Sequence, residues 1–277
     1  MEKEEIKEQR TPNDTQALYR EVPEKIDLTY RDDLHGFDEL RDALKRRRRR
    51  GGRFRLVDSG VFDGSQLEKL VSAGADLYTS DRVRKDILEL EFILKAAGNG
   101  GAVMAYLFHE ELQAEAESGS LTLSSLSHLG KEGLIVHISN REKERNFFVL
   151  SFMATQCRQG SGRLVYYHHG PIPPEFVSLG KEGVWIHVSD RNFSSEEDLP
   201  VLLDSISAAQ SAGSNIVLHV EKGMAFSFLH DIFQSGAVVL FKTAPQDFKS
   251  PLRPLEDEAR RTKLDFRSFY LYSNFLL

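Results

Sequence analysis

Histidines recur at one position in three short apolar segments of this chain. His137, His187 and His219 each lie inside a run rich in Val, Ile and Leu, namely LIVHIS, VWIHVS and NIVLHVE. If these runs are parallel strands, the three imidazoles project from one face of the sheet. Neutral imidazoles that converge in this way bind Zn²⁺, Mn²⁺ or Fe²⁺, and without a metal they act as acids and bases near neutral pH. A third interpretation is a hydrogen-bonded polar core, because the chain contains neither an HxH nor an HExxH spacing.

Four further residues at the ends of apolar runs complete the candidate catalytic centre: His168, Glu221, Asp58 and Lys242. A carboxylate at such a place can be a metal ligand or the base that activates a metal-bound water. A desolvated Lys242 fits a Schiff-base nucleophile, whereas an ion pair with Glu221 is the simpler interpretation.

Three arginines, Arg82, Arg141 and Arg191, each follow a Ser-Asp or Ser-Asn pair just beyond an apolar run. Guanidinium groups placed around one rim bind phosphate, sulfate or carboxylate in bidentate fashion, so these residues are candidates for anion binding. The same corners are also explained as helix caps, with the arginines paired to neighbouring carboxylates such as Glu142 or Asp81.

Strands that alternate with helices must position these residues. Eight short apolar runs are predicted as strands, at residues 54–59, 75–80, 102–109, 134–139, 163–169, 184–189, 215–221 and 237–242. The segments between them have helical periodicity, which is typical of parallel β/α units. Eight units predict an α/β fold of the (β/α)8 TIM-like barrel type, which takes roughly 250 residues. The alternative is an open doubly wound parallel sheet.

An internal repeat supports the barrel. SLSHLGKEGLIVHISNR (125–141) and FVSLGKEGVWIHVSDR (176–191) share LGKEG, an aliphatic run, a histidine and a Ser-Asn/Asp-Arg corner. The offset from Gly133 to Gly183 is 50 residues, so each unit contains two strands. This spacing predicts (βα)2 repeats, as in a barrel built by duplication.

Alternation along the predicted strands separates a helix-covered face from a face that lines the barrel lumen. The lumen face begins with apolar residues such as Trp185, continues with the three histidines, Tyr78 and Tyr166, and ends in polar side chains. Because unpaired polar groups are costly to bury, this gradient predicts a binding site at the C-terminal ends of the strands. In the third strand, either Tyr106 or His109 faces inward.

The chain ends differ in composition from the predicted barrel. Residues 1–35 predict a polar flexible arm, residues 36–52 a helix that ends in the basic run Arg46–Arg50, and residues 53–277 the barrel domain. Basic residues at a helix C-terminus complement the helix dipole, and we favour this explanation over contact with RNA. The aromatic tail DFRSFYLYSNFLL is a candidate surface for a homo-oligomer or a protein partner.

Composition excludes several classes of function. The 277 residues carry a net charge of −6, which gives no global attraction for nucleic acid or an anionic membrane. No apolar stretch approaches the ~18 residues of a membrane span. The single cysteine, Cys157, lies in a predicted helix and suits a packing role. One cysteine cannot form an intramolecular disulfide, which suits a reducing, cytoplasmic location. The absence of a P-loop, a GxGxxG after a strand and a GxSxG disfavours nucleotide hydrolysis, Rossmann binding and α/β-hydrolase chemistry.

These observations predict an enzyme that acts on a small anionic metabolite at the C-terminal mouth of the barrel. The chemistry is either metal-assisted hydrolysis or lyase chemistry, or acid–base chemistry by His and Glu. The competing hypothesis is a non-catalytic barrel that binds a ligand or a protein partner.

Overall fold

The computed structural model describes residues 28–50, 53–111, 121–192, 197–220, 226–241 and 266–268. The strands are β1 Leu28–Arg31, β2 Phe54–Val57, β3 Ala75–Ser80, β4 Met104–Phe108, β5 Ile135–Ser139, β6 Arg163–Tyr167, β7 Trp185–Ser189, β8 Ile216–Val220, β9 Val238–Phe241 and β10 Phe266–Ser268. The helices are α2 Phe37–Arg50, α3 Gly64–Ser72, α4 Ile87–Gly100, α5 Leu123–Lys131, α6 Phe147–Arg158, α7 Phe176–Lys181, α8 Asp198–Ser211 and α9 Phe226–Gln234, with a 3-10 turn η1 at Asp190–Asn192.

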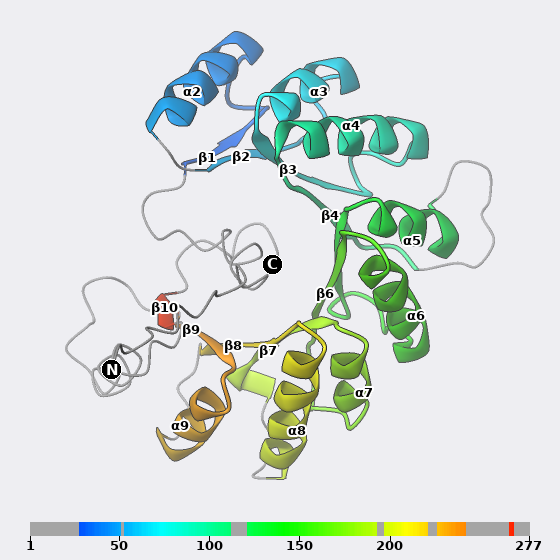
Figure 1. The fold of residues 1–277 in the computed structure, drawn as a ribbon, viewed down its shortest axis with the longest axis vertical. Coiled ribbons are helices and arrows are strands. Elements are labelled where there is room, and N and C mark those ends of the chain that lie inside the picture. Colours follow the sequence, from blue (N-terminus) through cyan, green and yellow to red (C-terminus); the bar gives the residue numbers. More distant parts are fainter. Residues whose placement is uncertain are drawn as a thin grey trace, which may run out of the picture.

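The ten strands form one parallel sheet in strict sequence order from β1 to β10. A doubly wound sheet would reverse its strand order part-way, so this order excludes that alternative and confirms an α/β fold of successive β/α units. Figure 1 shows the strands as an arc with the helices along its outer side. Among the described strands β1 and β10 do not pair, so these strands form an open arc and not a closed barrel.

All eight predicted runs contain a strand, and two further strands extend the sheet. Strand β1, which lies in the segment assigned to the polar arm, pairs with β2 from Leu28 opposite Phe54. Tyr30 of β1 stacks on Phe54 with ring centroids 4.6 Å apart. Four residues between charged neighbours are too short a pattern to identify a strand, and this explains why periodicity did not reveal β1.

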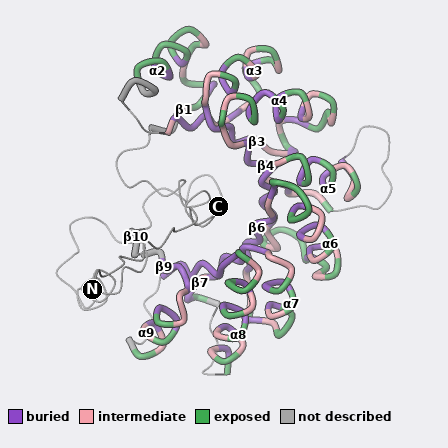
Figure 2. Tube along the Cα trace, in the orientation of Figure 1, coloured by how far each residue is buried: buried purple, intermediate pink, exposed green. Residues whose placement is uncertain are grey.

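The main hydrophobic core lies between the sheet and the helices. Leu56, Val136, Ile186 and Leu218 are buried from the strand side, together with helix residues such as Leu90. Figure 2 shows burial following the strands and the inward sides of the helices. None of the helices in the described ranges has both the length and the apolar character needed to cross a bilayer.

The two LGKEG segments occupy matching places, from α5 into β5 and from α7 into β7. The second glycine of each segment lies in the turn between helix and strand. Its φ is positive, 116° at Gly133 and 83° at Gly183, a conformation that glycine adopts readily. A Cβ on Gly180 would lie 3.0 Å from the Ser205 carbonyl oxygen and 3.0 Å from the Ala209 amide nitrogen of α8. In the first copy, a Cβ on Gly130 would overlap with Cys157 Sγ of α6. The shared glycines therefore serve a turn and a close contact between neighbouring helices in both copies.

Candidate functional site

Four polar side chains form a row across β5–β8 on the face of the sheet that is turned away from the helices. We call His137, Tyr167, His187 and His219 the histidine row. Two residues earlier on each of these strands is an apolar residue, and these belong to a second buried cluster: Ile135, Val165, Trp185 and Val217. The row thus lies toward the C-terminal ends of the strands, above an apolar floor.

The members of the row contact one another from strand to strand. The Tyr167 hydroxyl lies 3.0 Å from His137 Nδ1, and the two rings are stacked with an interplanar angle of 16°. The Tyr167 and His187 ring centroids are 4.5 Å apart. His187 Nδ1 lies 2.9 Å from His219 Nε2, which is a hydrogen bond between two imidazoles. The row is therefore a continuous series of ring contacts from β5 to β8, with one hydrogen bond at each end.

Burial keeps the three imidazoles of the row neutral. His137 is 1% exposed, and burial lowers its pKa to about 3. Burial and the like charge of His169 lower the pKa of His219 to about 4. Burial, followed by the like charges of His219 and His137, lowers the pKa of His187 well below its usual value. At pH 7 each ring therefore carries one hydrogen and offers one donor and one acceptor nitrogen.

His137 Nε2 is a buried nitrogen with no hydrogen-bond partner within the part of the chain that the structure describes. The other ring nitrogen of His137 is satisfied by Tyr167. A buried polar atom without a partner costs about 1–3 kcal/mol, and native structures keep few of them. A polar atom of a ligand or a water molecule at Nε2 would remove this cost.

The register of β6 differs from the expectation. Tyr166 and His168 were expected on the lumen face, but Tyr166 belongs to the helix-side core and its hydroxyl lies 3.2 Å from His168 Nδ1. His168 Nε2 lies 2.8 Å from the Pro171 carbonyl oxygen. Because Leu164, Val165, Tyr166 and Tyr167 are apolar or aromatic on both faces, alternation could not choose between the two registers. Tyr167 is the residue of the row that was not predicted from the sequence.

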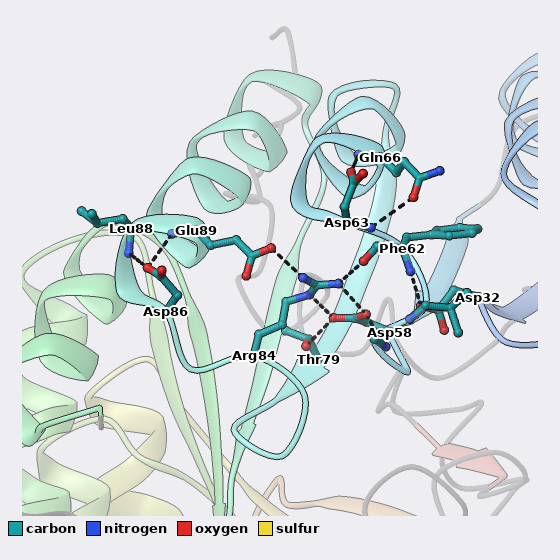
Figure 3. Close-up of polar contacts among 12 residues, drawn as sticks. Asp32, Asp58, Phe62, Asp63, Gln66, Thr79, Arg84, Asp86, Leu88 and Glu89 are labelled. Atoms are coloured by element: carbon teal, nitrogen blue, oxygen red, sulfur yellow. Dashed lines mark hydrogen bonds and ion pairs between the residues drawn. The ribbon is translucent and has the colours of Figure 1, made fainter. Parts of the chain in front are cut away.

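The structure also places Asp58 apart from the histidine row, on the helix side of β2 (Figure 3). Its carboxylate accepts from Arg84 Nε at 2.6 Å and Nη2 at 3.1 Å, and from Thr79 Oγ1 at 2.7 Å. Arg84 also contacts Glu89 at 2.6 Å and the Phe62 carbonyl oxygen at 2.5 Å. This buried network joins the loops after β2 and β3, so Asp58 holds loops together here.

In the third predicted strand, Tyr106 lies in the helix-side core and its hydroxyl donates to the Arg84 carbonyl oxygen at 2.6 Å. His109 follows the end of β4, where Asp81 binds its ring. Cys157 is buried, which confirms the packing environment expected for it.

The three candidate anion-binding arginines are exposed. The amide groups of Arg141 and Arg191 donate to Ser139 Oγ at 3.1 Å and to Ser189 Oγ at 3.2 Å, so the serines of both corners hold equivalent turns. Arg82 pairs with Glu142 at 2.6 Å, the surface pair that was the alternative explanation for it. Arg141 and Arg191 follow strands that carry a histidine of the row, whereas Arg82 follows β3.

Several expected contributors lie outside the described residues: Glu221, Lys242, the side chains of Arg47–Arg50 and most of the aromatic tail. Across the ranges that the structure does describe, no three His, Cys, Asp or Glu side chains are close enough together to hold a metal ion. His187 and His219 direct one nitrogen each at the other, so a metal bound by both at these nitrogens would have to break that bond.

No protein-family model matches this chain, and no curated protein sequence matches it. Similar solved structures include a mandelate racemase/muconate lactonizing protein from Herpetosiphon aurantiacus, with 17% identity and a TM-score of 0.37 over 78% of this chain and 54% of that chain. The chain thus spans about half the length of that protein. An HpcH/HpaI aldolase/citrate lyase family protein from Burkholderia cenocepacia has 11% identity and a TM-score of 0.34, over 80% of this chain and 99% of that chain. A D-psicose 3-epimerase has 15% identity and a TM-score of 0.31, over 72% and 91%. Similarity at this level carries no argument about chemistry.

Proposed function

We propose that the protein is an enzyme that binds a small anionic metabolite against the histidine row and polarises one of its oxygen atoms with a neutral imidazole. The observation that carries this proposal is the buried Nε2 atom of His137, which has no partner in the described part of the chain. A ligand oxygen at this position would satisfy the nitrogen. It would also lie in an environment of low dielectric, where a hydrogen bond is strong.

An anionic ligand favours the tautomer of His137 that carries its hydrogen on Nε2, because this hydrogen can be donated to a ligand oxygen. When the Tyr167 hydroxyl donates to Nδ1, the hydrogen of the neutral ring is on Nε2 and points at the ligand. A neutral imidazole donor stabilises negative charge that develops on a carbonyl oxygen without first giving up its proton. The hydrogen-bonded His187 and His219 rings supply an adjacent pair between which a proton can move.

The charged end of the metabolite is assigned to Arg141 and Arg191. Both residues are exposed at corners that directly follow β5 and β7, the strands that carry His137 and His187. Guanidinium groups bind carboxylate and phosphate in bidentate geometry. Arg82 is the weaker candidate because it follows β3, a strand that carries no histidine of the row.

The metal-dependent version of this proposal uses His137, His187 and His219 as ligands of Zn²⁺, Mn²⁺ or Fe²⁺. We favour the metal-free version because the His187–His219 hydrogen bond uses the two nitrogens that face each other. Elemental analysis of protein purified without chelators separates the two versions. Stoichiometric metal that is lost when His137 and His187 are both changed to alanine would establish the metal-dependent one.

Ligand binding at His137 can be tested by nuclear magnetic resonance of protein labelled with ¹⁵N-histidine. The probes are oxalate, pyruvate and glycerol 3-phosphate, which present carboxylate, 2-oxo and phosphate groups. We expect at least one probe to shift the His137 Nε2 resonance while His128, an exposed histidine on α5, stays unchanged. A probe that binds is then followed by proton spectroscopy in D₂O for conversion or exchange.

The variant H137F keeps an aromatic ring of similar size and removes Nε2, so it should lose both binding and conversion. H128Q is the matched control and should retain both. Resonances of His137 that no probe moves, or conversion that survives H137F, would contradict the proposal.

A second candidate function, a non-catalytic barrel that binds a partner, is favoured by exposed apolar side chains on two helices. Phe148 is 79% and Phe152 42% exposed on α6, one turn apart, and Leu88 is 71% and Phe92 55% exposed on α4. Exposed apolar patches mark interaction surfaces. If a second copy covers these side chains, sedimentation equilibrium will show a dimer for the wild type and a monomer for F92S/F148S. A wild-type monomer would remove self-association through these side chains.

A further inference from the structure

Asp81 and His109 form a buried carboxylate–imidazole pair where β3 and β4 end. Asp81 Oδ1 lies 2.6 Å from His109 Nδ1, and the Asp81 side chain is 1% exposed. The other carboxylate oxygen accepts from the amide groups of His109 and Glu110, both at 2.8 Å. One carboxylate therefore fixes both the ring and the backbone of His109.

Arg145 holds the same segment from the side of β5. Its guanidinium donates to the carbonyl oxygens of Ser139 at 2.8 Å, His109 at 2.7 Å and Glu110. Arg145 is itself buried, with 7% exposure. His109 and Glu110 are thus held by two buried charged side chains that follow β3 and β5, and the imidazole is positioned before any ligand arrives.

The charge of Asp81 determines the tautomer of His109. Burial alone would raise the pKa of Asp81, but hydrogen bonds from the His109 ring and from the amides of Glu110 and His109 outweigh burial and lower it. An ionised carboxylate only accepts hydrogen bonds, so Nδ1 carries the hydrogen and Nε2 carries the lone pair. The His109 side chain is 20% exposed, and since Nδ1 faces the buried carboxylate, the exposed part of the ring is the part with Nε2.

The other pairs of histidine and carboxylate in the described ranges differ in burial and geometry. His35–Glu39, His128–Glu91 and His230–Asp231 have nitrogen–oxygen distances of 3.1, 3.5 and 3.7 Å, and their carboxylates are 58%, 38% and 55% exposed. Such surface pairs contribute little and do not fix a ring. The short contact to a buried carboxylate therefore distinguishes His109 from these three histidines.

We propose that Asp81 and His109 form a second active centre, in which His109 Nε2 is the general base that activates water for the hydrolysis of a carboxylic ester. Nε2 takes a proton from water while the water oxygen forms a bond to the ester carbonyl carbon. The bond from this carbon to the alkoxy or aryloxy oxygen then breaks, and the leaving oxygen takes the proton from Nε2. Asp81 is the positioning residue, which holds Nδ1–H and stabilises the transient imidazolium. This centre belongs to β3 and β4 and does not depend on the histidine row.

A cavity of about 360 Å³ adjoins the segment that carries His109, and it is lined by Glu111, Glu144, Arg145, Asn146, Val149 and Leu150 and not by Asp81 or His109 themselves. Glu111 is two residues after His109, and Arg145 binds the His109 carbonyl oxygen. The volume suits a small molecule. Two glutamates disfavour an anion, and Arg145 already donates to three carbonyl oxygens. We therefore assign a neutral or cationic ester to this site, in contrast to the anion assigned to the histidine row.

The test is hydrolysis of p-nitrophenyl acetate by the full chain, followed by release of p-nitrophenolate. We expect kcat/KM to fall by about 100-fold in H109Q and by a factor on the order of 10 in D81N. H128Q, which removes an imidazole paired with a partly exposed carboxylate, should keep the wild-type rate. An H109Q variant that hydrolyses the ester as fast as H128Q would overturn the proposal.

A second measurement separates positioning from folding, and its first part uses the wild-type protein alone. The ¹⁵N spectrum of wild-type histidines should show His109 as the Nδ1–H tautomer. D81N should shift His109 toward the Nε2–H tautomer. An Nε2–H tautomer in the wild type would overturn the proposal. The charged groups around His109 are Asp81, Arg145, Glu110 with its partner Lys85, and Glu142 with its partner Arg82.

Discussion

His187 and His219 are hydrogen-bonded to each other through Nδ1 of the first ring and Nε2 of the second, at 2.9 Å. One of these nitrogens must donate and the other must accept, so the two rings share one hydrogen between them. Both side chains are less than 10% exposed, at 7% and 8%. Replacing either ring with an apolar side chain removes this hydrogen bond and leaves the facing nitrogen of the other ring buried.

Replacing His219 with phenylalanine should therefore destabilise the protein although the volume of the side chain is nearly kept. We expect the free energy of unfolding to fall by about 1–3 kcal/mol, because His187 Nδ1 loses its partner. Urea denaturation at pH 7.5 measures this loss. H128F at an exposed position of α5 is the control and should change stability by less than about 0.5 kcal/mol. Equal midpoints for the two variants would show that the imidazole pair contributes nothing.

Stability should decrease as the pH falls from about 7.5 to about 5, because the row resists protonation in the folded state. The pKa values of His137 and His219 are lowered to about 3 and about 4, whereas a histidine in the unfolded chain titrates near 6.5. Below about pH 6.5 the unfolded state binds protons that the folded state does not, so acid favours unfolding. At pH 5 the lowered pKa of each of these two rings reduces the free energy of unfolding by about 2 kcal/mol relative to pH 7.5.

The difference between wild type and H137F isolates one ring from the carboxylates that titrate in the same range. Urea denaturation at both pH values should show that the variant loses about 2 kcal/mol less than the wild type between them. A loss of the same size in both proteins would mean that His137 is protonated in the folded state at pH 5.

The buried ion pair between Asp58 and Arg84 should contribute far more to stability than the surface pair between Arg82 and Glu142. The Asp58 and Arg84 side chains are 0% and 7% exposed, whereas those of Arg82 and Glu142 are 59% and 56% exposed. R84M removes one buried charge and leaves the Asp58 carboxylate uncompensated, at a cost of about 3–5 kcal/mol. E142Q should leave the free energy of unfolding nearly unchanged. Thermal and urea unfolding of both variants provide the comparison, and a small loss in R84M would contradict the role assigned to the network.

The strands and their order could be predicted from sequence because each β/α unit has a recognisable local sequence pattern. An aliphatic run of four to six residues, a glycine at the helix end and a capped helix recur along the chain, and parallel units in sequence follow from them. Strand β1 could not be predicted in this way, since LTYR is short and follows a charged segment. Its place in the sheet depends on pairing with β2 and on the contact between Tyr30 and Phe54, which are tertiary effects.

The candidate site could be predicted only where one face of a strand is clearly polar. In β5, β7 and β8 a single histidine interrupts an aliphatic run, so alternation places it correctly on the face away from the helices. In β6 both faces carry apolar or aromatic residues, and the choice between Tyr166 and Tyr167 depended on packing against α6 and α7. Arg84, Arg145 and the Asp81–His109 pair depend on contacts between loops, for which the sequence has no periodic signal.

Two glycines in helices should respond oppositely to substitution by alanine. A Cβ on Gly180 would lie 3.0 Å from two backbone atoms of α8, the Ser205 carbonyl oxygen and the Ala209 amide nitrogen, whereas a Cβ on Gly98 would meet nothing within 4 Å. G180A must push α7 and α8 apart and should destabilise the protein by about 1–3 kcal/mol. G98A adds helix propensity at an exposed position of α4 and should stabilise it by up to about 1 kcal/mol. Urea denaturation of both variants decides the matter. If G180A were as stable as the wild type, α7 and α8 would not be in close backbone contact, and the first glycine of the second LGKEG segment would have no packing role.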